Sequence, residues 1–119
     1  MYKNATVSVY PEIQTRNTDG DFITSWGYLE DPVVAASETL RCDVQPRRLR
    51  ESELKAFGIS EEKADAKIAF FRRSVYIADG ARAYVVSDFP GEPAKYFDIK
   101  TPSRWPGHGE AILIPVQGE

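Results

Sequence analysis

Residues 84–116 constrain the fold of this chain most, because strand-like runs alternate there with strong turn signals. Residues 84–86, 96–100 and 111–116 are apolar or alternate between apolar and polar side chains. Clusters rich in Gly and Pro at 90–93 and 102–109 separate these runs. This pattern indicates antiparallel strands that are joined by hairpins.

The last of these runs is apolar on both faces. Ile112, Ile114 and Val116 share one face, because side chains alternate along a strand. Ala111 and Leu113 make the opposite face apolar as well. We therefore predict that this closing strand is buried on both sides.

The preceding sequence continues the strand pattern. Residues 11–21 are polar, so we predict a loop there, with a tight turn at Asp19-Gly20. The cleanest alternation, at 40–45, is followed by Pro46, which we expect to end that strand. Further strands are predicted at 5–10, 22–29, 67–71, 74–78 and 82–87.

Residues 47–66 differ in character, since they are charged and contain good helix formers. Gly58 is suited to close one short helix, and Ser60 to begin a second short turn. Short strands with closely spaced turns suggest a small barrel or a sandwich. We expect a mainly β fold: a small antiparallel β-barrel of six to eight strands, forming one domain over 1–119, with a helical insertion at about 47–67.

The composition excludes several classes of protein. The 119 residues carry a formal charge of −3, which argues against a surface that grips nucleic-acid phosphate throughout. A single cysteine permits no internal disulfide and fits a reducing compartment. No apolar run approaches the ~20 residues that span a bilayer, and the first residues do not resemble a secretory signal. We expect a cytoplasmic product with no membrane partner.

The chain offers little for catalysis or metal binding. Cys42 lies in the alternating strand and is predicted to be a small core residue. His108 is the only histidine, and we expect a structural role for it in a Pro/Gly turn. We predict no enzyme activity, no metal and no cofactor. A hydrolase or ligand-binding barrel that uses His108, Asp98 and Glu110 is the least favoured alternative.

The arginines are more clustered than the acids. Arg47, Arg48 and Arg50 enter the helical insertion, and Arg72 and Arg73 leave the strand after it. If these side chains meet in space, they form a positive patch for phosphate or for an acidic partner. The plainer interpretation is a solvated charged face.

Two further places are candidate contacts. Trp105 follows Arg104 in a Pro/Gly-rich segment, and Trp and Arg are enriched at interface hot spots, although core packing is the commoner role of Trp. Asp19, Gly20 and Asp21 occupy a predicted loop tip.

Taken in order, these features resemble the head closure (stopper) and head–tail joining proteins of tailed bacteriophages. The resemblance rests on order and spacing over nearly the whole chain. It covers Asp19-Gly20, Trp26, the strand at 40–46, the insertion at 51–67 with Gly58-Ile59, the aromatic strand at 68–71, the segments 79–86 and 96–99, Trp105, His108 and the closing strand.

The resemblance implies a structural virion protein, from an active phage or a prophage, located at the head–tail junction. Copies of it would form a ring below the portal or adaptor protein, close the channel for packaged double-stranded DNA and provide a docking surface for the tail terminator or tail tube. The segments 15–22 and 47–67 are the candidates for channel or partner contacts. The alternative is a nucleic-acid-binding barrel of the OB type, with aromatic and Arg side chains on one sheet face.

Overall fold

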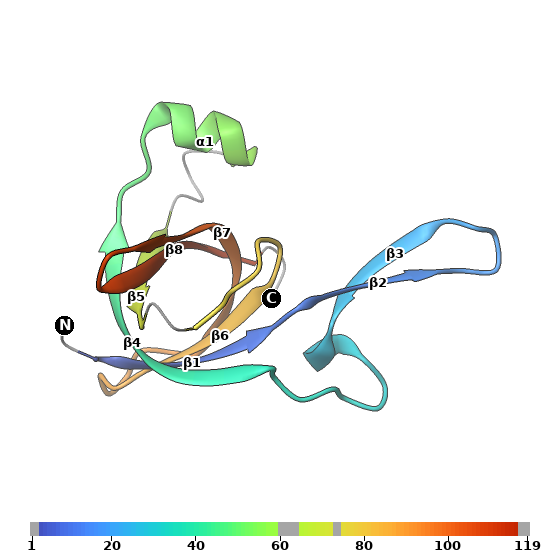
Figure 1. Cartoon of the computed structure of the whole chain (residues 1–119), viewed down its shortest axis with the longest axis horizontal. Coiled ribbons are helices and arrows are strands. Elements are labelled where there is room, and N and C mark those ends of the chain that lie inside the picture. The colour runs from blue at the N-terminus through green and yellow to red at the C-terminus, as the bar shows by residue number, and fades with distance from the viewer. Residues whose placement is uncertain (1–2, 60–64, 73–74, 117–119) are drawn as a thin grey trace.

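The chain folds into a closed antiparallel β-barrel from which a β-hairpin projects (Figure 1). The computed structural model describes residues 3–59, 65–72 and 75–116. The barrel strands lie in the order β1-β4-β5-β8-β7-β6, and β2 and β3 form the separate hairpin. Their bounds are β1 Ala5–Tyr10, β2 Glu12–Arg16, β3 Phe22–Trp26, β4 Glu38–Arg47, β5 Ala66–Phe71, β6 Arg82–Ser87, β7 Lys95–Trp105 and β8 His108–Pro115. The predicted mainly β barrel of six to eight strands is confirmed.

Alternate side chains of the barrel strands point inward and form the core. Along β1, for instance, Ala5, Val7 and Val9 are buried while the residues between them are partly exposed. The largest fully buried side chains are Phe71, Ile99, Leu113 and Cys42. Cys42 is thus a core residue, as predicted.

β8 is buried on both faces, which confirms the prediction for the closing strand. Ala111 and Leu113 belong to the barrel core. Ile112 and Ile114 point outward into a second apolar cluster beside the helix α1, Glu51–Phe57. The helix therefore covers an apolar part of the outer barrel surface, which β8 forms together with Ala66 of β5.

α1 is the predicted short helix, and the insertion that carries it runs from the end of β4 to the start of β5 (Figure 1). Leu54 and Phe57 turn toward the outer face of β8. Gly58 closes the helix at φ 67°, a left-handed conformation that glycine adopts without steric cost. The second turn predicted at Ser60 lies outside the described residues.

β4 runs one residue beyond Pro46, where we had expected it to end. Val44 donates its backbone N–H to the side-chain oxygen of Asn4, on the β1 side of the strand. Pro46 directs its nitrogen to the same side two residues later, but β1 pairs with β4 only as far as Cys42. Proline, which has no N–H, is tolerated there because no ladder hydrogen bond requires a donor at this position.

The loop predicted at 11–21 is wrong in part, because Glu12–Arg16 forms β2 and pairs with β3. Polar residues can form this strand since both faces of the hairpin are largely in solvent. β3 ends at Trp26 instead of Leu29. The chain turns at Gly27, where a Cβ atom would lie 2.5 Å from the carbonyl oxygen of Val34.

The turn expected at 102–109 is also shorter than predicted. β7 continues to Trp105 and β8 begins at His108, so only Pro106 and Gly107 connect them. The register shifts between Lys100 and Ser103, and this bulge accommodates Pro102 within the strand. His108 is therefore the first residue of β8, paired with Trp105, and not a turn residue.

The strand predicted at 74–78 is absent from the described part of it, residues 75–78. Val75 and Ile77 instead pack against the barrel core from an irregular segment. Val75 and Ile77 alternate with polar residues because both contact the barrel core. The same alternation is expected of a strand, so the sequence pattern did not distinguish the two. No helix in the described ranges is long and apolar enough to cross a membrane.

Candidate interaction surfaces

The structure distributes the candidate residues over three places. Asp19, Gly20 and Asp21 lie at the tip of the β2–β3 hairpin, which we call the arm. The second and third places are opposite ends of the barrel. Arg47, at the end of β4, pairs with Ala66 at the start of the antiparallel strand β5, and Arg72 follows the other end of β5. Arg47, Arg48 and Arg50 lie at the α1 end, and Arg72, Arg104 and Trp105 lie at the end from which the arm projects.

The condition for one positive patch is therefore not met among the described arginines, because Arg47 and Arg72 do not meet in space. β5 separates Arg47 from Arg72 by its full length, which at ~3.3 Å per residue is about 20 Å. Arg73 lies outside the described residues. Arg47 pairs with Ala66 at the start of β5, and Arg72 follows Phe71 at its end, so the extended strand holds the two arginines apart.

The arm tip is a tightly fixed turn. The side-chain oxygen of Asn17 accepts hydrogen bonds from the backbone N–H groups of Asp19 at 3.0 Å and Asp21 at 2.9 Å. Gly20 has φ 86° and donates its N–H to the carbonyl of Asn17. Both aspartates are exposed. The turn that carries these two aspartates joins β2 to β3 at the end of the arm that lies far from the barrel (Figure 1).

The base of the arm is anchored to the barrel by Trp26 and Arg82. Trp26 donates its indole N–H to the carbonyl of Gly80 at 2.9 Å. The Arg82 guanidinium stacks over the Trp26 ring, 3.5 Å from the ring centre, and donates to Asp98 and to the hydroxyl of Tyr28. Burial alone lowers the pKa of Arg82, but the bonds to Tyr28 and Asp98 together outweigh this effect and raise it.

Four tyrosines continue this anchor over the outer face of the barrel. The rings of Tyr28 and Tyr96 stack with their centres 3.9 Å apart. The Tyr10 ring packs against both of these rings, and the Tyr84 ring packs against that of Tyr96. All four are partly buried, so the cluster joins the segment after β3 to β6 and β7, and is not an open platform for a ligand.

A cationic and aromatic patch lies at the end of the barrel near the arm. We define the barrel-end patch as Arg72, Tyr76, Arg104 and Trp105. Gly109 of β8 pairs with Phe71 on one side and with Arg104 on the other, so Arg72 and Arg104 flank the start of β8.

The patch is exposed, and two of its members, Arg104 and Tyr76, contact each other. Tyr76 is 71% exposed and Trp105 is 51% exposed. The Arg104 guanidinium lies 5.2 Å from the centre of the Tyr76 ring and donates to the carbonyl of Val75. This composition is typical of interface hot spots. Trp105 therefore lies at the surface and does not take the core role that is commoner for Trp.

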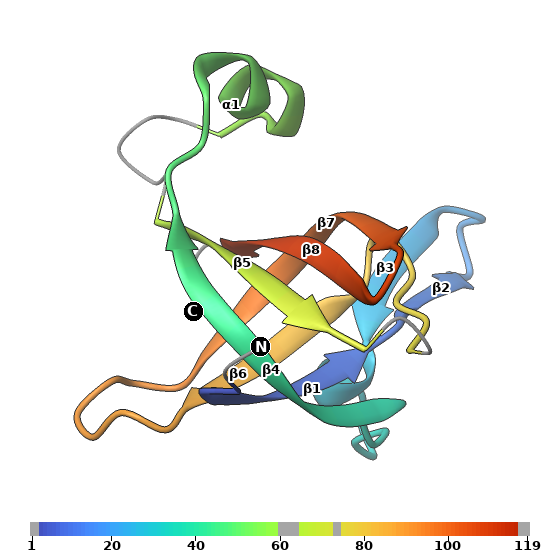
Figure 2. The same cartoon turned by 60° about the vertical axis from the view of Figure 1, so that its left-hand side comes forward.

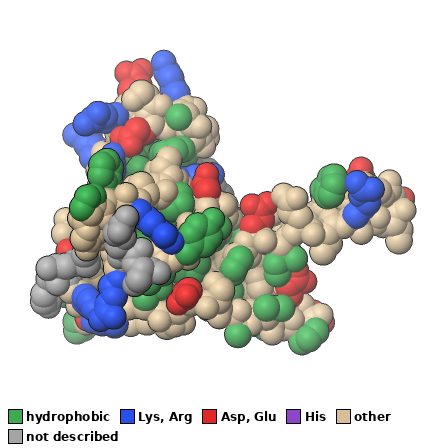
Figure 3. Space-filling model, viewed as in Figure 1, with side chains coloured by type: hydrophobic (Ala, Val, Ile, Leu, Met, Phe, Trp, Pro, Cys, Tyr) green, Lys and Arg blue, Asp and Glu red, His purple; other side chains and the backbone are tan. Residues whose placement is uncertain are grey.

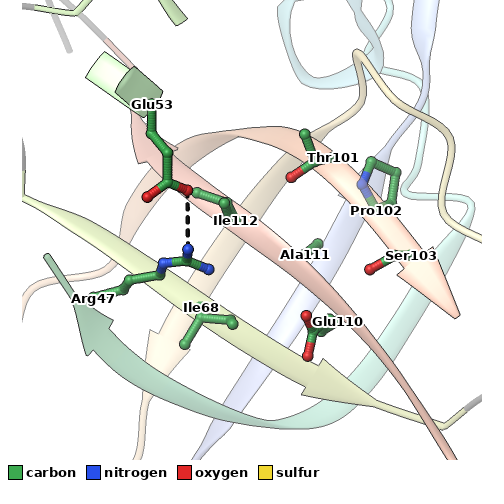
Figure 4. Close-up of a pocket in the computed structure, with 9 residues that line it drawn as sticks. All are labelled: Arg47, Glu53, Ile68, Thr101, Pro102, Ser103, Glu110, Ala111 and Ile112. Atoms are coloured by element: carbon green, nitrogen blue, oxygen red, sulfur yellow. Dashed lines mark hydrogen bonds and ion pairs between the residues drawn. The ribbon is translucent and has the colours of Figure 1, made fainter. Parts of the chain in front are cut away.

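At the α1 end the charge of Arg47 is compensated by an acidic side chain. Arg47 forms an ion pair with Glu53 at 2.9 Å, and the other carboxylate oxygen of Glu53 accepts from the backbone N–H of Arg50. This pair borders an open hollow of about 360 Å³ between α1 and the outer faces of β7 and β8 (Figure 4). Thr101, on the rim of the hollow, has φ 46°, an uncommon conformation for a β-branched residue.

The residues of the hydrolase alternative are not assembled. His108 lies 3.5 Å from Glu110, but Asp98 is seven positions along β7 from Trp105, the partner of His108, and is bonded to Arg82. Burial raises the pKa of the Cys42 thiol to about 11, so this thiol is not an activated nucleophile. No group of three or more candidate metal ligands occurs within residues 3–59, 65–72 and 75–116.

Comparisons with known proteins support the fold alone. No protein-family model matches this chain, and no curated protein matches it. The chain is similar to the solution structure of protein SF1141 from Shigella flexneri 2a, with a TM-score of 0.60 and 14% sequence identity. The match covers 98% of this chain and 96% of that one. At this identity the likeness extends to the architecture and says nothing about activity.

Proposed function

We propose that this chain is a structural subunit of the head–tail connector of a tailed phage. In this proposal copies of the chain form a ring below the portal or adaptor protein. The ring closes the channel around packaged double-stranded DNA and offers a docking surface to the tail terminator or tail tube. The resemblance of the whole sequence to head closure and head–tail joining proteins motivates the assignment.

The observation that carries the proposal is the arm. A closed barrel leaves no free sheet edge through which copies could join. The arm adds two strands that pair only with each other in the described structure, and it exposes Phe22 and Ile23 away from the core. Figure 3 shows apolar and charged side chains together at its tip. Such an appendage suits contact with a neighbour better than it suits a free monomer.

The two ends of the barrel also suit a component that joins two different structures. α1 lies at one end, and the arm with the barrel-end patch lies at the other (Figure 2). A ring of parallel copies would present the α1 end to one neighbour and the arm end to the other. The net negative charge fits a channel through which DNA passes without tight binding.

The test is electron microscopy of particles from a producing strain that lacks this gene. We expect emptied or DNA-leaking heads beside separate, finished tails. Intact infectious virions, or absence of the protein from purified wild-type virions, would contradict the proposal.

A second candidate is a nucleic-acid-binding barrel of the OB type. The barrel-end patch favours it, because exposed aromatic rings beside Arg side chains can stack on bases and pair with phosphates. The test is salt-dependent binding of a labelled single-stranded oligonucleotide. Absence of binding at low salt rejects this function.

A further inference from the structure

The arm and the barrel-end patch are two exposed surfaces at the same end of the barrel. A two-stranded hairpin is marginally stable by itself in water, so its exposed apolar side chains favour a partner. Phe22 is 68% exposed at the start of β3. The Arg16 guanidinium lies over its ring, 4.7 Å from the ring centre, and no other ring or guanidinium among the described residues stacks on it. Tyr76 and Trp105 are exposed to a similar degree on the patch.

The charges of the two surfaces are opposite. At the tip, the carboxylates of Asp19 and Asp21 have no hydrogen bond or ion pair to any described residue. On the patch, Arg72 has no such partner in the described structure, and Arg104 bonds only to a carbonyl. The tip therefore presents two carboxylates and the Phe22 ring, over which the Arg16 guanidinium lies, so its charged side chains are acidic on balance. The patch contributes two guanidinium groups and two aromatic rings and no carboxylate.

The arm cannot reach the patch of its own barrel. Only Pro11 separates β1 from β2, so the direction of one strand of the arm is set by the barrel. The other strand is held at Trp26 by Gly80 and Arg82. With both strands fixed at the base, the tip points away from the barrel (Figures 1 and 2). An arm tip that docks on the patch therefore has to belong to another molecule.

We propose that the arm tip of one copy of this chain docks on the barrel-end patch of a second copy. Asp19 and Asp21 pair with Arg72 and Arg104, and Phe22 packs against Tyr76 and Trp105. A strand of five residues spans about 17 Å, a length that extends the tip toward a barrel lying alongside. This contact rests on the proposed function, for which it names the subunit interface.

The contact joins two different surfaces and therefore repeats from copy to copy. Repetition in one rotational sense closes a ring. Reciprocal exchange of two arms closes a dimer instead, which would keep the contact but not the ring.

The first experiment reverses the charges and then restores the match. The tip variant is Asp19→Lys with Asp21→Lys, and the patch variant is Arg72→Glu with Arg104→Glu. Self-association of each is measured by sedimentation up to millimolar concentration, with circular dichroism to verify folding. We expect each variant to associate roughly tenfold or more weakly than the wild type, because like charges then face each other. An equimolar mixture should regain association, since each variant supplies the complement of the other.

Matched controls place the same charge changes at the α1 end. Glu51→Lys with Asp65→Lys matches the tip variant, and Arg48→Glu with Lys95→Glu matches the patch variant. All four residues are exposed and lie away from both surfaces. The controls should associate as the wild type does. Equal weakening in the controls would show that net charge alone governs association, and would overturn the docking.

A second measurement locates the contact without relying on its strength. Position 22 receives a photoreactive phenylalanine analogue, and labelled and unlabelled chains are mixed so that intermolecular adducts are recognised by mass. We expect adducts on peptides that contain residues 72–76 or 104–108. Adducts elsewhere, or none at millimolar concentration, would overturn the proposal. Oligonucleotide binding that is lost in the patch variant while self-association stays unchanged would also overturn it and favour the nucleic-acid candidate.

These outcomes are separable from those of the gene deletion. Confirmed docking together with infectious particles from the deletion strain would retain the interface and reject the connector. Defective heads together with adducts outside the patch would retain the connector and reject this interface.

Discussion

The guanidinium of Arg82 lies 3.5 Å from the centre of the Trp26 ring, and this stack joins the arm to the barrel. The two residues are far apart in the sequence, and they meet because β1 continues into the arm while it pairs with β6. The same guanidinium also bonds to Asp98 and Tyr28. Arg82 therefore helps to fix the direction of the arm, together with the bond from Trp26 to Gly80 and the short link at Pro11.

Replacing Arg82 should loosen the arm and destabilise the fold. Arg82→Met removes the stack and leaves Asp98 and Tyr28 without this donor, so we expect a loss of about 1–3 kcal/mol of unfolding free energy. Arg82→Lys keeps the charge but not the planar fork and should restore only part of it. Urea unfolding followed by tryptophan fluorescence measures both. The control is Arg104→Met, which should change stability little because Arg104 is exposed.

Gly109 should tolerate no side chain unless Phe71 is replaced by a smaller residue. A Cβ atom at Gly109 would lie 2.4 Å from the Phe71 ring. Gly109→Ala should therefore cost about 1–3 kcal/mol through overpacking. Phe71→Leu in the same chain makes room, so the double variant should be more stable than the sum of the single changes predicts. Additive effects in this cycle would show that the two positions do not clash.

The helix α1 should depend on the outer face of β8. Ile114→Ala removes apolar contact beneath α1, whereas Leu113→Ala opens a cavity in the barrel core. We expect Leu113→Ala to lower global stability by about 2–5 kcal/mol. Ile114→Ala should mainly speed amide exchange in residues 51–57, since a seven-residue helix is not stable alone. Unchanged exchange in α1 would contradict the packing described.

Cys42 should make the fold sensitive to alkaline pH. Burial raises the pKa of its thiol from 9.0 to about 11, so between these values the unfolded chain releases a proton that the folded chain retains. The contribution of Cys42 to stability is present below pH 9 and is lost as the pH rises toward 11. Cys42→Ala lacks the thiol, so any pH dependence of stability that this variant retains comes from other titrating groups. The difference in unfolding free energy between the two proteins should fall over that pH range.

The buried thiol should also be chemically silent in the folded protein. Alkylation by iodoacetamide at pH 8 should be slow in buffer and fast in denaturant, because only the exposed thiolate reacts. Rapid labelling of the native protein would show that β4 opens readily.

The sequence by itself determined the local elements. Apolar or alternating runs of residues predicted the barrel strands β1, β4, β5, β6 and β8, the burial of Cys42 in β4, and the two apolar faces of the closing strand. Good helix formers followed by Gly58 predicted α1. These features depend on side-chain period and on backbone preference, which are properties of a few neighbouring residues.

Only the tertiary structure decided which candidates share a surface. Arg47 ends β4 and pairs with the first residue of β5, whereas Arg72 follows the last residue of β5, so this strand holds them at opposite ends of the barrel. Arg72, Arg104 and Trp105 come together because two strand pairings converge on Gly109. The arm likewise needed tertiary contacts to be recognised, since β2 is polar and its direction is fixed by Trp26 and Arg82. Strand register and barrel closure link residues that are distant in the chain, and no local pattern encodes those links.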